Sequence, residues 1–148
     1  MQGRVLSSRI AVLIALAMCG ILSSGLVRAA DEIKVVYHLN EGIEQAARAM
    51  GNIRNHLAAD PKAKIQVVTH GRGIDFLLKG AKTPTGGLFT SDIEELSVRG
   101  IEFKVCANTL ERRNIERSQV VSDGKIVASG VAEVARLQAK EGYVYLRP

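Results

Sequence analysis

The sequence predicts a doubly wound α/β domain, in which a mostly parallel β-sheet has helices on both faces. From residue 33 onward, short segments rich in β-branched and aromatic residues alternate with longer amphipathic segments. This alternation is typical of parallel strands joined by helical crossovers. The chain has 148 residues, of which 47% are hydrophobic and 24% charged, and these values fit one globular domain.

Short β-rich runs bounded by turn residues predict the strands. The predicted strands are 33–39, 64–69, 101–105 and 143–146. Residues 120–121 and 125–128 flank an Asp123-Gly124 turn, which predicts either a hairpin or an interrupted further strand.

Helical spacing of apolar residues and capping residues predict the helices between these strands. The predicted helices are one from an Asn40 cap to Asp60-Pro61, a short one at 74–78, one from a Thr90 or Ser91 cap to Gly100, a charged one at 110–118, and one from a Ser129 cap through Lys140, with Gly142 after it.

The first 29 residues have the features of a secretory signal peptide. Arg4 and Arg9 precede an uncharged apolar run at 10–22, and small residues flank the expected cleavage position after Ala29. The run is shorter than the roughly 20 residues that cross a bilayer, which favours a cleaved signal over a permanent anchor. We therefore expect a mature domain over 30–148 in the periplasm, with no membrane attachment after cleavage.

The net charge of +5 does not indicate a nucleic-acid partner. Three of the 20 basic residues lie in the predicted leader, so 17 basic and 15 acidic residues remain in the mature chain. This small excess is scattered, and no aromatic residue lies beside a basic cluster to form a base-stacking platform. We expect no nucleic-acid binding.

Cleavage would leave Cys106 as the single cysteine of the mature chain, because Cys19 lies in the leader. A lone thiol in an oxidising compartment can form no internal disulfide. Such a residue is either buried and inert or retained because its reactivity is used.

Reactive side chains lie where three predicted strands end. His38 is near the end of the first strand, His70 follows the second, and Cys106 follows the third. Ligands of α/β sheets bind at the carboxyl ends of the strands, so these residues would converge if the strands are neighbours. The other candidate site residues follow the same strands: Asn40, Gly71, Asn108 and Thr109.

Three interpretations of this group stay open on residue types alone. A nearby imidazolium or helix N-terminus would lower the thiol pKa, and the thiolate of Cys106 could then hold sulfur as a persulfide or attack an electrophile. The thiol could instead pack as a small hydrophobe. Two histidines and a cysteine could also bind zinc or copper, but their spacing matches no ligand motif, so no metal is expected.

The mature chain resembles the exported branch of the DsrE/DsrF-like family, a sulfur-relay group. The blocks that carry the resemblance are V-V-Y-H-L-N at 35–40, V-V-T-H-G-R-G-I at 67–74, F-K-V-C-A-N-T-L at 103–110, S-G-V-A-E-V-A-R-L-Q at 129–138 and G-Y-V-Y-L-R-P at 142–148.

This resemblance implies a three-layer α/β/α domain with a mainly parallel five-stranded sheet, assembled into homo-trimers or homo-hexamers. Sulfur-transferring members carry a persulfide on a cysteine at the position of Cys106. We expect a periplasmic sulfur-binding or sulfur-transfer protein with no cofactor beyond a Cys106 persulfide, in which His38 and His70 tune the thiolate and Asn108 steadies the terminal sulfur. A donor or acceptor protein would be its partner. Whether it is an enzyme stays open, and the alternative is a non-enzymatic oligomeric module that binds a small ligand or metal.

Overall fold

Five parallel strands run through residues 32–148, the part of the chain that the computed structural model describes. They are β1 (Lys34–Leu39), β2 (Lys64–Thr69), β3 (Glu102–Cys106), β4 (Gly124–Val127) and β5 (Val144–Leu146). Their order in the sheet is β4-β3-β2-β1-β5, and each neighbouring pair is parallel. The predicted five-stranded, mainly parallel sheet is confirmed. The predicted signal peptide lies outside the described residues.

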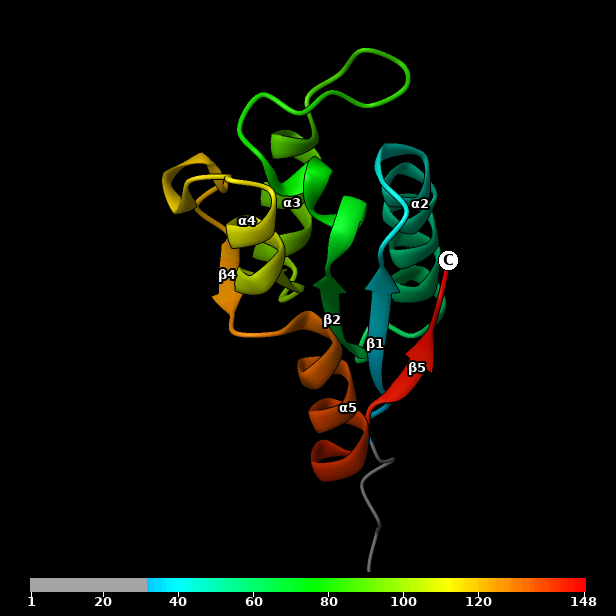
Figure 1. Ribbon diagram of the computed structural model, residues 1–148. Coiled ribbons are helices and arrows are strands. Elements are labelled where there is room, and N and C mark those ends of the chain that lie inside the picture. Colours follow the sequence, from blue (N-terminus) through cyan, green and yellow to red (C-terminus); the bar gives the residue numbers. More distant parts are fainter. Residues whose placement is uncertain (1–31) are drawn as a thin grey trace, which may run out of the picture. The chain divides into compact units, whose positions relative to one another are not determined.

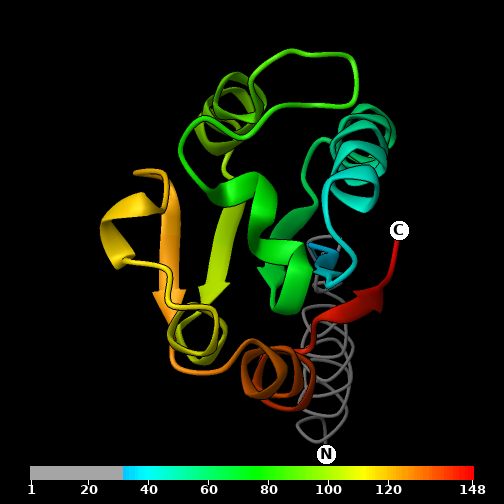
Figure 2. The ribbon, with the colours of Figure 1, turned by 45° about the horizontal axis from the view of Figure 1, so that its top comes forward.

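Helices cover both faces of the sheet, as the predicted three-layer arrangement requires (Figures 1 and 2). On one face lie α2 (Ile43–Ala59), α3 (Phe89–Val98) and the 3₁₀ helix η1 (Gly71–Leu77), and on the other lies α5 (Gly130–Glu141). Figure 2 shows α2 and α3 above the sheet and α5 below it. The short helices α4 (Ala107–Arg112) and η2 (Arg117–Gln119) connect β3 to β4.

Strand side chains alternate between two cores of unequal size. Because successive residues of a strand point to opposite faces, odd-numbered and even-numbered positions on β1–β3 separate. The odd-numbered residues enter the large core under α2 and α3: Val35, Tyr37, Leu39, Ile65, Val67, Phe103 and Val105. Val36 and Val68 enter the small core under α5. His38 and Cys106, also at even-numbered positions, therefore share the α5 face of the sheet.

The segment after β3 differs from the sequence prediction. The helix expected at 110–118 is α4, which begins at Ala107, directly after Cys106, and ends at Arg112. The open choice at residues 120–128 is resolved as a strand, since β4 pairs in parallel with β3 and is not part of a hairpin. The thiol therefore lies at a strand-to-helix junction with no intervening loop.

Helix capping follows the sequence prediction at one helix and departs from it at two. Ser129 caps α5 as expected, because its Oγ accepts a hydrogen bond from Ala132 N–H at 3.4 Å. Asn40 does not cap α2. The N-cap is Gly42, with φ 106°, and the side chain of Gln45 instead accepts hydrogen bonds from the N–H groups of Asn40 and Glu41, at 2.8 and 2.9 Å.

The third helix begins earlier than predicted because of burial. Thr90 and Ser91 were the expected caps, but α3 begins at Phe89 and has no side-chain cap. The Phe89 side chain is fully buried, and its ring lies 5.5 Å from that of Phe76 in the large core. Packing of this aromatic pair therefore fixes the helix start in place of a cap.

Candidate functional site

The carboxyl ends of β1, β2 and β3 bring the three reactive side chains into one region. The strands are neighbours, which satisfies the condition for convergence. The rings of His38 and His70 are 4.8 Å apart between centroids. The Cβ atoms of His70 and Cys106 both approach Gly130: they lie 3.2 and 3.3 Å from the position that a Cβ on this glycine would take. His70 thus lies between His38 and Cys106.

Cys106 is a free cysteine and is almost completely covered, with 4% of its surface exposed. Burial raises the pKa of its thiol, but hydrogen bonds from Gly130 N–H, from the Thr109 hydroxyl and N–H, and from Asn108 N–H together outweigh burial and lower it. Hydrogen bonds to the charged form of a group favour that form. The surroundings of Cys106 therefore favour the thiolate, which an apolar core position would not do.

Thr109 links the thiol to the segment after β2. Its Oγ1 accepts a hydrogen bond from Gly71 N–H at 3.0 Å, which leaves the hydroxyl proton to donate to the sulfur. Arg113 strengthens the same connection, because its Nη1 donates to Gly71 O at 3.1 Å and to Asp75 at 2.6 Å. Gly71 itself has φ 55°, a conformation that glycine adopts without strain.

The histidines contribute neutral rings to this region. Burial lowers the pKa of His38, and the nearby charges of His70 and Arg147 lower it further. Burial alone lowers the pKa of His70. At neutral pH neither ring is an imidazolium, so the lowered thiol pKa comes from N–H and hydroxyl donors rather than from a histidine charge. His38 Nδ1 is fixed by the hydroxyl of Tyr145 on β5, at 2.8 Å.

The two asparagines are placed differently. Asn108 is an exposed residue in the first turn of α4, and its backbone N–H, which also donates to Ala128 O at 3.3 Å, is the group that affects the thiol. Asn40 is partly buried, and its Oδ1 makes no hydrogen bond with the described residues. His38 Nε2 is also buried without a hydrogen-bond partner there. Buried polar atoms of this kind are uncommon and mark a place where a polar ligand could bind.

Two residues next to this region were not among the predicted site residues. Gly130 is the first residue of α5 and lies over Cys106, and Tyr145 orients His38 from the edge strand. The Ser129 cap gives a partial signal for Gly130, because it fixes the start of α5 in the sequence. No sequence signal places the start of α5 beside β3, because the contact between Gly130 and Cys106 depends on how the chain crosses from β4 to β5.

The described residues give no support for a metal centre. Within 32–148, no three His, Cys, Asp or Glu side chains are grouped so that they could hold a metal ion.

No helix within residues 32–148 is long and apolar enough to span a bilayer.

The fold and the strand-end thiol define an α/β/α protein with its candidate site at the carboxyl edge of a parallel sheet. The chain belongs to the DsrE/DsrF-like family, whose model matches residues 37–148. This confirms the resemblance seen in the sequence motifs.

Solved structures similar to this chain include the two that follow. One is the protein of unknown function MTH1491 from Methanobacterium thermoautotrophicum, with 27% identity and a TM-score of 0.70, covering 79% of this chain and 100% of that one. The other is the ychN protein from E. coli, with 15% identity and a TM-score of 0.62, covering 79% of this chain and 98% of that one. At that identity the second likeness shows the fold alone. The chain has no match among curated proteins.

The lowered histidine pKa values predict a loss of stability in mild acid. A histidine whose pKa is lower in the folded state takes up its proton first in the unfolded state. Protonation then favours unfolding as the pH falls below the unfolded value of about 6.5. We expect the urea midpoint to be lower at pH 5.5 than at pH 7.5, and the difference to shrink in the variant His38→Gln/His70→Gln. A wild-type urea midpoint that is the same at pH 5.5 and pH 7.5 would contradict the lowered histidine pKa values.

Proposed function

We propose that this protein binds and transfers sulfane sulfur, using Cys106 as the group that carries it. The thiolate of Cys106 attacks a sulfane sulfur of a polysulfide, a bond forms between the two sulfur atoms, and the donor leaves one sulfur shorter. The product on the protein is a persulfide anion, and no external oxidant is needed. An acceptor thiolate or cyanide then removes the outer sulfur and restores the cysteine thiolate.

The observation that carries this proposal is the place of the nearly buried sulfur, at the junction of β3 with α4 and against Gly130, the first residue of α5. Donors at Gly130, Asn108 and Thr109 lower the pKa of its thiol. A persulfide also bears its charge on sulfur, and N–H groups that stabilise a thiolate can stabilise this anion. An inert packing cysteine requires no such donors. Membership of the DsrE/DsrF-like family supports the same chemistry.

The experiment is to load the purified protein with polysulfide or thiosulfate and to measure its intact mass. We expect the wild type to gain the mass of one sulfur atom and Cys106→Ser to gain nothing. Dithiothreitol should remove the added mass, because it reduces persulfides. The absence of an adduct on the wild type, or an equal adduct on Cys106→Ser, would disprove the proposal.

The second candidate function is binding of a small polar ligand beside His38. Two buried atoms without hydrogen-bond partners, His38 Nε2 and Asn40 Oδ1, favour it. Metal analysis of natively purified protein and calorimetric titration of zinc and copper test the metal form of this alternative. Stoichiometric metal that is lost in His38→Ala would favour it over sulfur transfer, whereas metal-free protein that forms the persulfide would exclude it.

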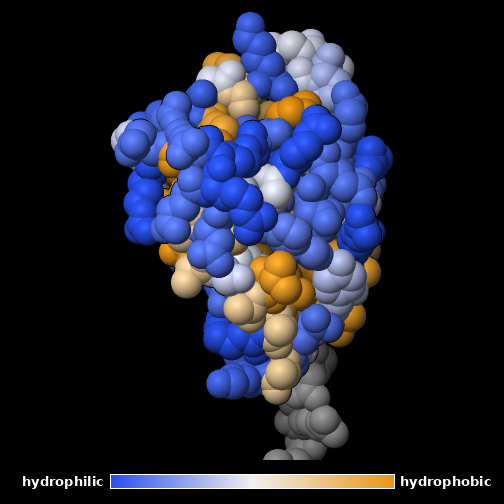
Figure 3. Space-filling view, viewed as in Figure 1, coloured by the Kyte–Doolittle hydropathy of each residue, from blue (hydrophilic) through white to orange (hydrophobic). Residues whose placement is uncertain are grey.

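We propose that the chain assembles into homo-trimers or homo-hexamers. Edge strand β5 exposes large hydrophobic side chains, with 56% of Val144 and 39% of Leu146 accessible in the single chain. On α5, Val131 is 60% exposed. Figure 3 shows hydrophobic surface on the lower part of the molecule, at the level of this helix. Exposed apolar surfaces of this kind are typical of protein contacts. Light scattering on the purified protein should give three or six times the monomer mass, and a monomer or a dimer would refute this assembly.

We also propose that residues 1–29 direct export to the periplasm and are then removed. The charged start, the short apolar run and the small residues before position 30 support this proposal. N-terminal sequencing of protein recovered from the periplasmic fraction should begin at Ala30. Recovery of the uncleaved chain from the cytoplasm would refute it.

A further inference from the structure

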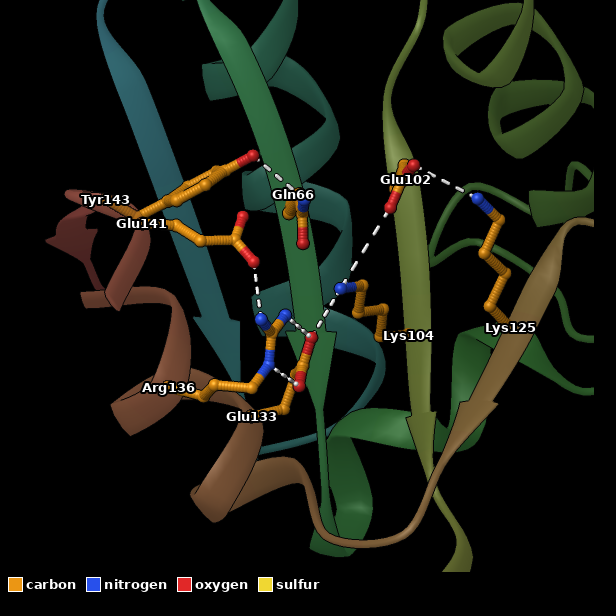
Figure 4. Close-up of polar contacts among 8 residues, drawn as sticks. All are labelled: Gln66, Glu102, Lys104, Lys125, Glu133, Arg136, Glu141 and Tyr143. Carbon is orange, nitrogen blue, oxygen red and sulfur yellow. Dashed lines mark hydrogen bonds and ion pairs between the residues drawn. The ribbon is translucent and has the colours of Figure 1, made fainter. Parts of the chain in front are cut away.

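A network of charged side chains lies between the sheet and α5 (Figure 4). One of its members, Lys104, belongs to β3, the strand that ends at Cys106. Lys104 projects from β3 two residues before Cys106, on the same face, and only 8% of it is exposed. Its Nζ donates a hydrogen bond to Glu133 of α5, and Glu102 lies 4.0 Å away. The lysine therefore joins the strand that carries the thiol to the helix that covers it.

Glu133 is held as a carboxylate at the centre of this network. Both of its oxygens accept hydrogen bonds from Arg136, at 2.8 Å, and Arg136 also pairs with Glu141. The Arg136 hydrogen bonds, against an opposing effect of burial and with the help of Lys104, lower the pKa of Glu133 to about 2. Glu133 therefore faces Lys104 as a carboxylate at neutral pH.

The first turn of α5 connects this ion pair to the thiol. Glu133 N–H donates to Ser129 O at 3.0 Å and closes the turn that contains Gly130. Gly130 lies directly against the strand ends, because a Cβ there would be 2.7 Å from Thr69 O and 3.3 Å from the Cβ of Cys106. A small rotation or lift of this turn would move Gly130 away from Cys106 and change the donors that lower the thiol pKa. Helix α5 covers this face of the sheet, and its Val134 and Leu137 pack into the small core.

We propose that the Lys104–Glu133 ion pair is a positioning device that holds the first turn of α5 on β3 and so keeps Gly130 against Cys106. Neither side chain is a catalytic residue in this account. The inference deepens the proposed function, since it rests on Cys106 as the group that carries sulfur. Its test measures the thiol itself and does not require sulfur transfer to occur.

Neutralising Glu133 separates two ways in which this residue could affect the Cys106 thiol, because its charge and its hold on α5 predict opposite changes in the thiol pKa. Several charged or titratable groups lie on the elements packed around the thiol. They are His38 on β1, His70 after β2, Glu102 and Lys104 on β3, Glu111 and Arg112 on α4, Arg113 after α4, Lys125 on β4, and Glu133, Arg136, Lys140 and Glu141 on α5. If Glu133 acted on the thiol through its charge, then its neutralisation would favour the thiolate. If Glu133 acts by holding α5, then its neutralisation releases Gly130 and disfavours the thiolate.

The experiment is the rate of Cys106 alkylation by iodoacetamide against pH, in the folded protein. We expect Glu133→Gln to react about three- to tenfold more slowly than the wild type at pH 6, because one donor to a charged sulfur is lost. Lys104→Met should slow the reaction by a similar factor. Lys125→Met is the matched control, since Lys125 pairs with Glu102 on the surface, away from α5, and its rate should equal that of the wild type.

A double variant keeps the test decisive if a buried lone charge prevents folding of a single variant. Lys104→Met/Glu133→Leu removes the pair without leaving an unpaired charge, so it should fold. We expect it to react as slowly as the single variants, because each already releases the helix. A wild-type rate in the double variant, or an equal or faster rate in Glu133→Gln, would overturn the inference. If these rates fall as expected but wild-type protein forms no persulfide, the proposed function fails and the positioning role stands.

Discussion

Replacing Thr109 with valine is expected to slow the alkylation of Cys106 about tenfold at pH 6. The substitution keeps the shape of the side chain but removes the hydroxyl that donates to the sulfur and accepts from Gly71 N–H at 3.0 Å. A hydrogen bond to a charged group contributes about 1.5–3 kcal/mol, which is enough for a change of this size. The Gly71 N–H would also lose its acceptor, so a destabilisation of about 1–3 kcal/mol should accompany the change.

Thr109→Ser is the matched control for this prediction. Serine retains the hydroxyl, and we expect its alkylation profile to stay close to that of the wild type. Denaturant unfolding of both variants separates lost stability from lost reactivity. A valine variant with the wild-type pH profile would show that the hydroxyl does not act on the sulfur.

Replacing Gly73 with alanine is expected to destabilise the fold by about 3 kcal/mol, through overpacking against backbone. A Cβ at this position would lie 2.1 Å from Leu39 O and 2.6 Å from Asn40 N. These are main-chain atoms at the end of β1, and they cannot move aside as a flexible side chain can. The alanine would push η1 away from the strand that carries His38. Urea unfolding measures the effect as a lower midpoint.

Gly51→Ala provides the control, because Gly51 is an exposed helical glycine with nothing within 4 Å of a Cβ. Alanine is better than glycine inside a helix by about 0.5–1 kcal/mol, so this variant should be more stable than the wild type. If both alanine variants had the same stability, the close approach of η1 to β1 would not be a constraint on the fold.

The fold was predictable from the sequence because periodicity is a local property. The β-branched runs gave four of the five strands, and the Ser129 cap and Gly142 gave the limits of α5. The errors occurred where another side-chain contact replaces the expected cap. Gln45 accepts hydrogen bonds from the N–H groups of Asn40 and Glu41, and α2 begins after Gly42 rather than after an Asn40 cap. Burial of Phe89 starts α3 before the predicted caps.

The candidate site was predictable only in part. The rule that strand ends meet at one edge correctly indicated that His38, His70 and Cys106 would lie in one region. Sequence could not identify what lowers the thiol pKa. Imidazolium charge was one suggested cause, but burial keeps the histidines neutral, and Gly130 N–H acts from another helix. Contacts across the sheet depend on crossover geometry, which spacing does not encode.

Release of sulfur from the loaded protein by cyanide tests the central claim most directly. Cyanide attacks the outer sulfur of a persulfide, forms thiocyanate and returns the cysteine. The account predicts one thiocyanate per polysulfide-loaded chain, none from Cys106→Ser, and a second round after reloading. Thiocyanate released equally from Cys106→Ser, or none released from the loaded wild type, would contradict the assignment of Cys106 as the sulfur carrier.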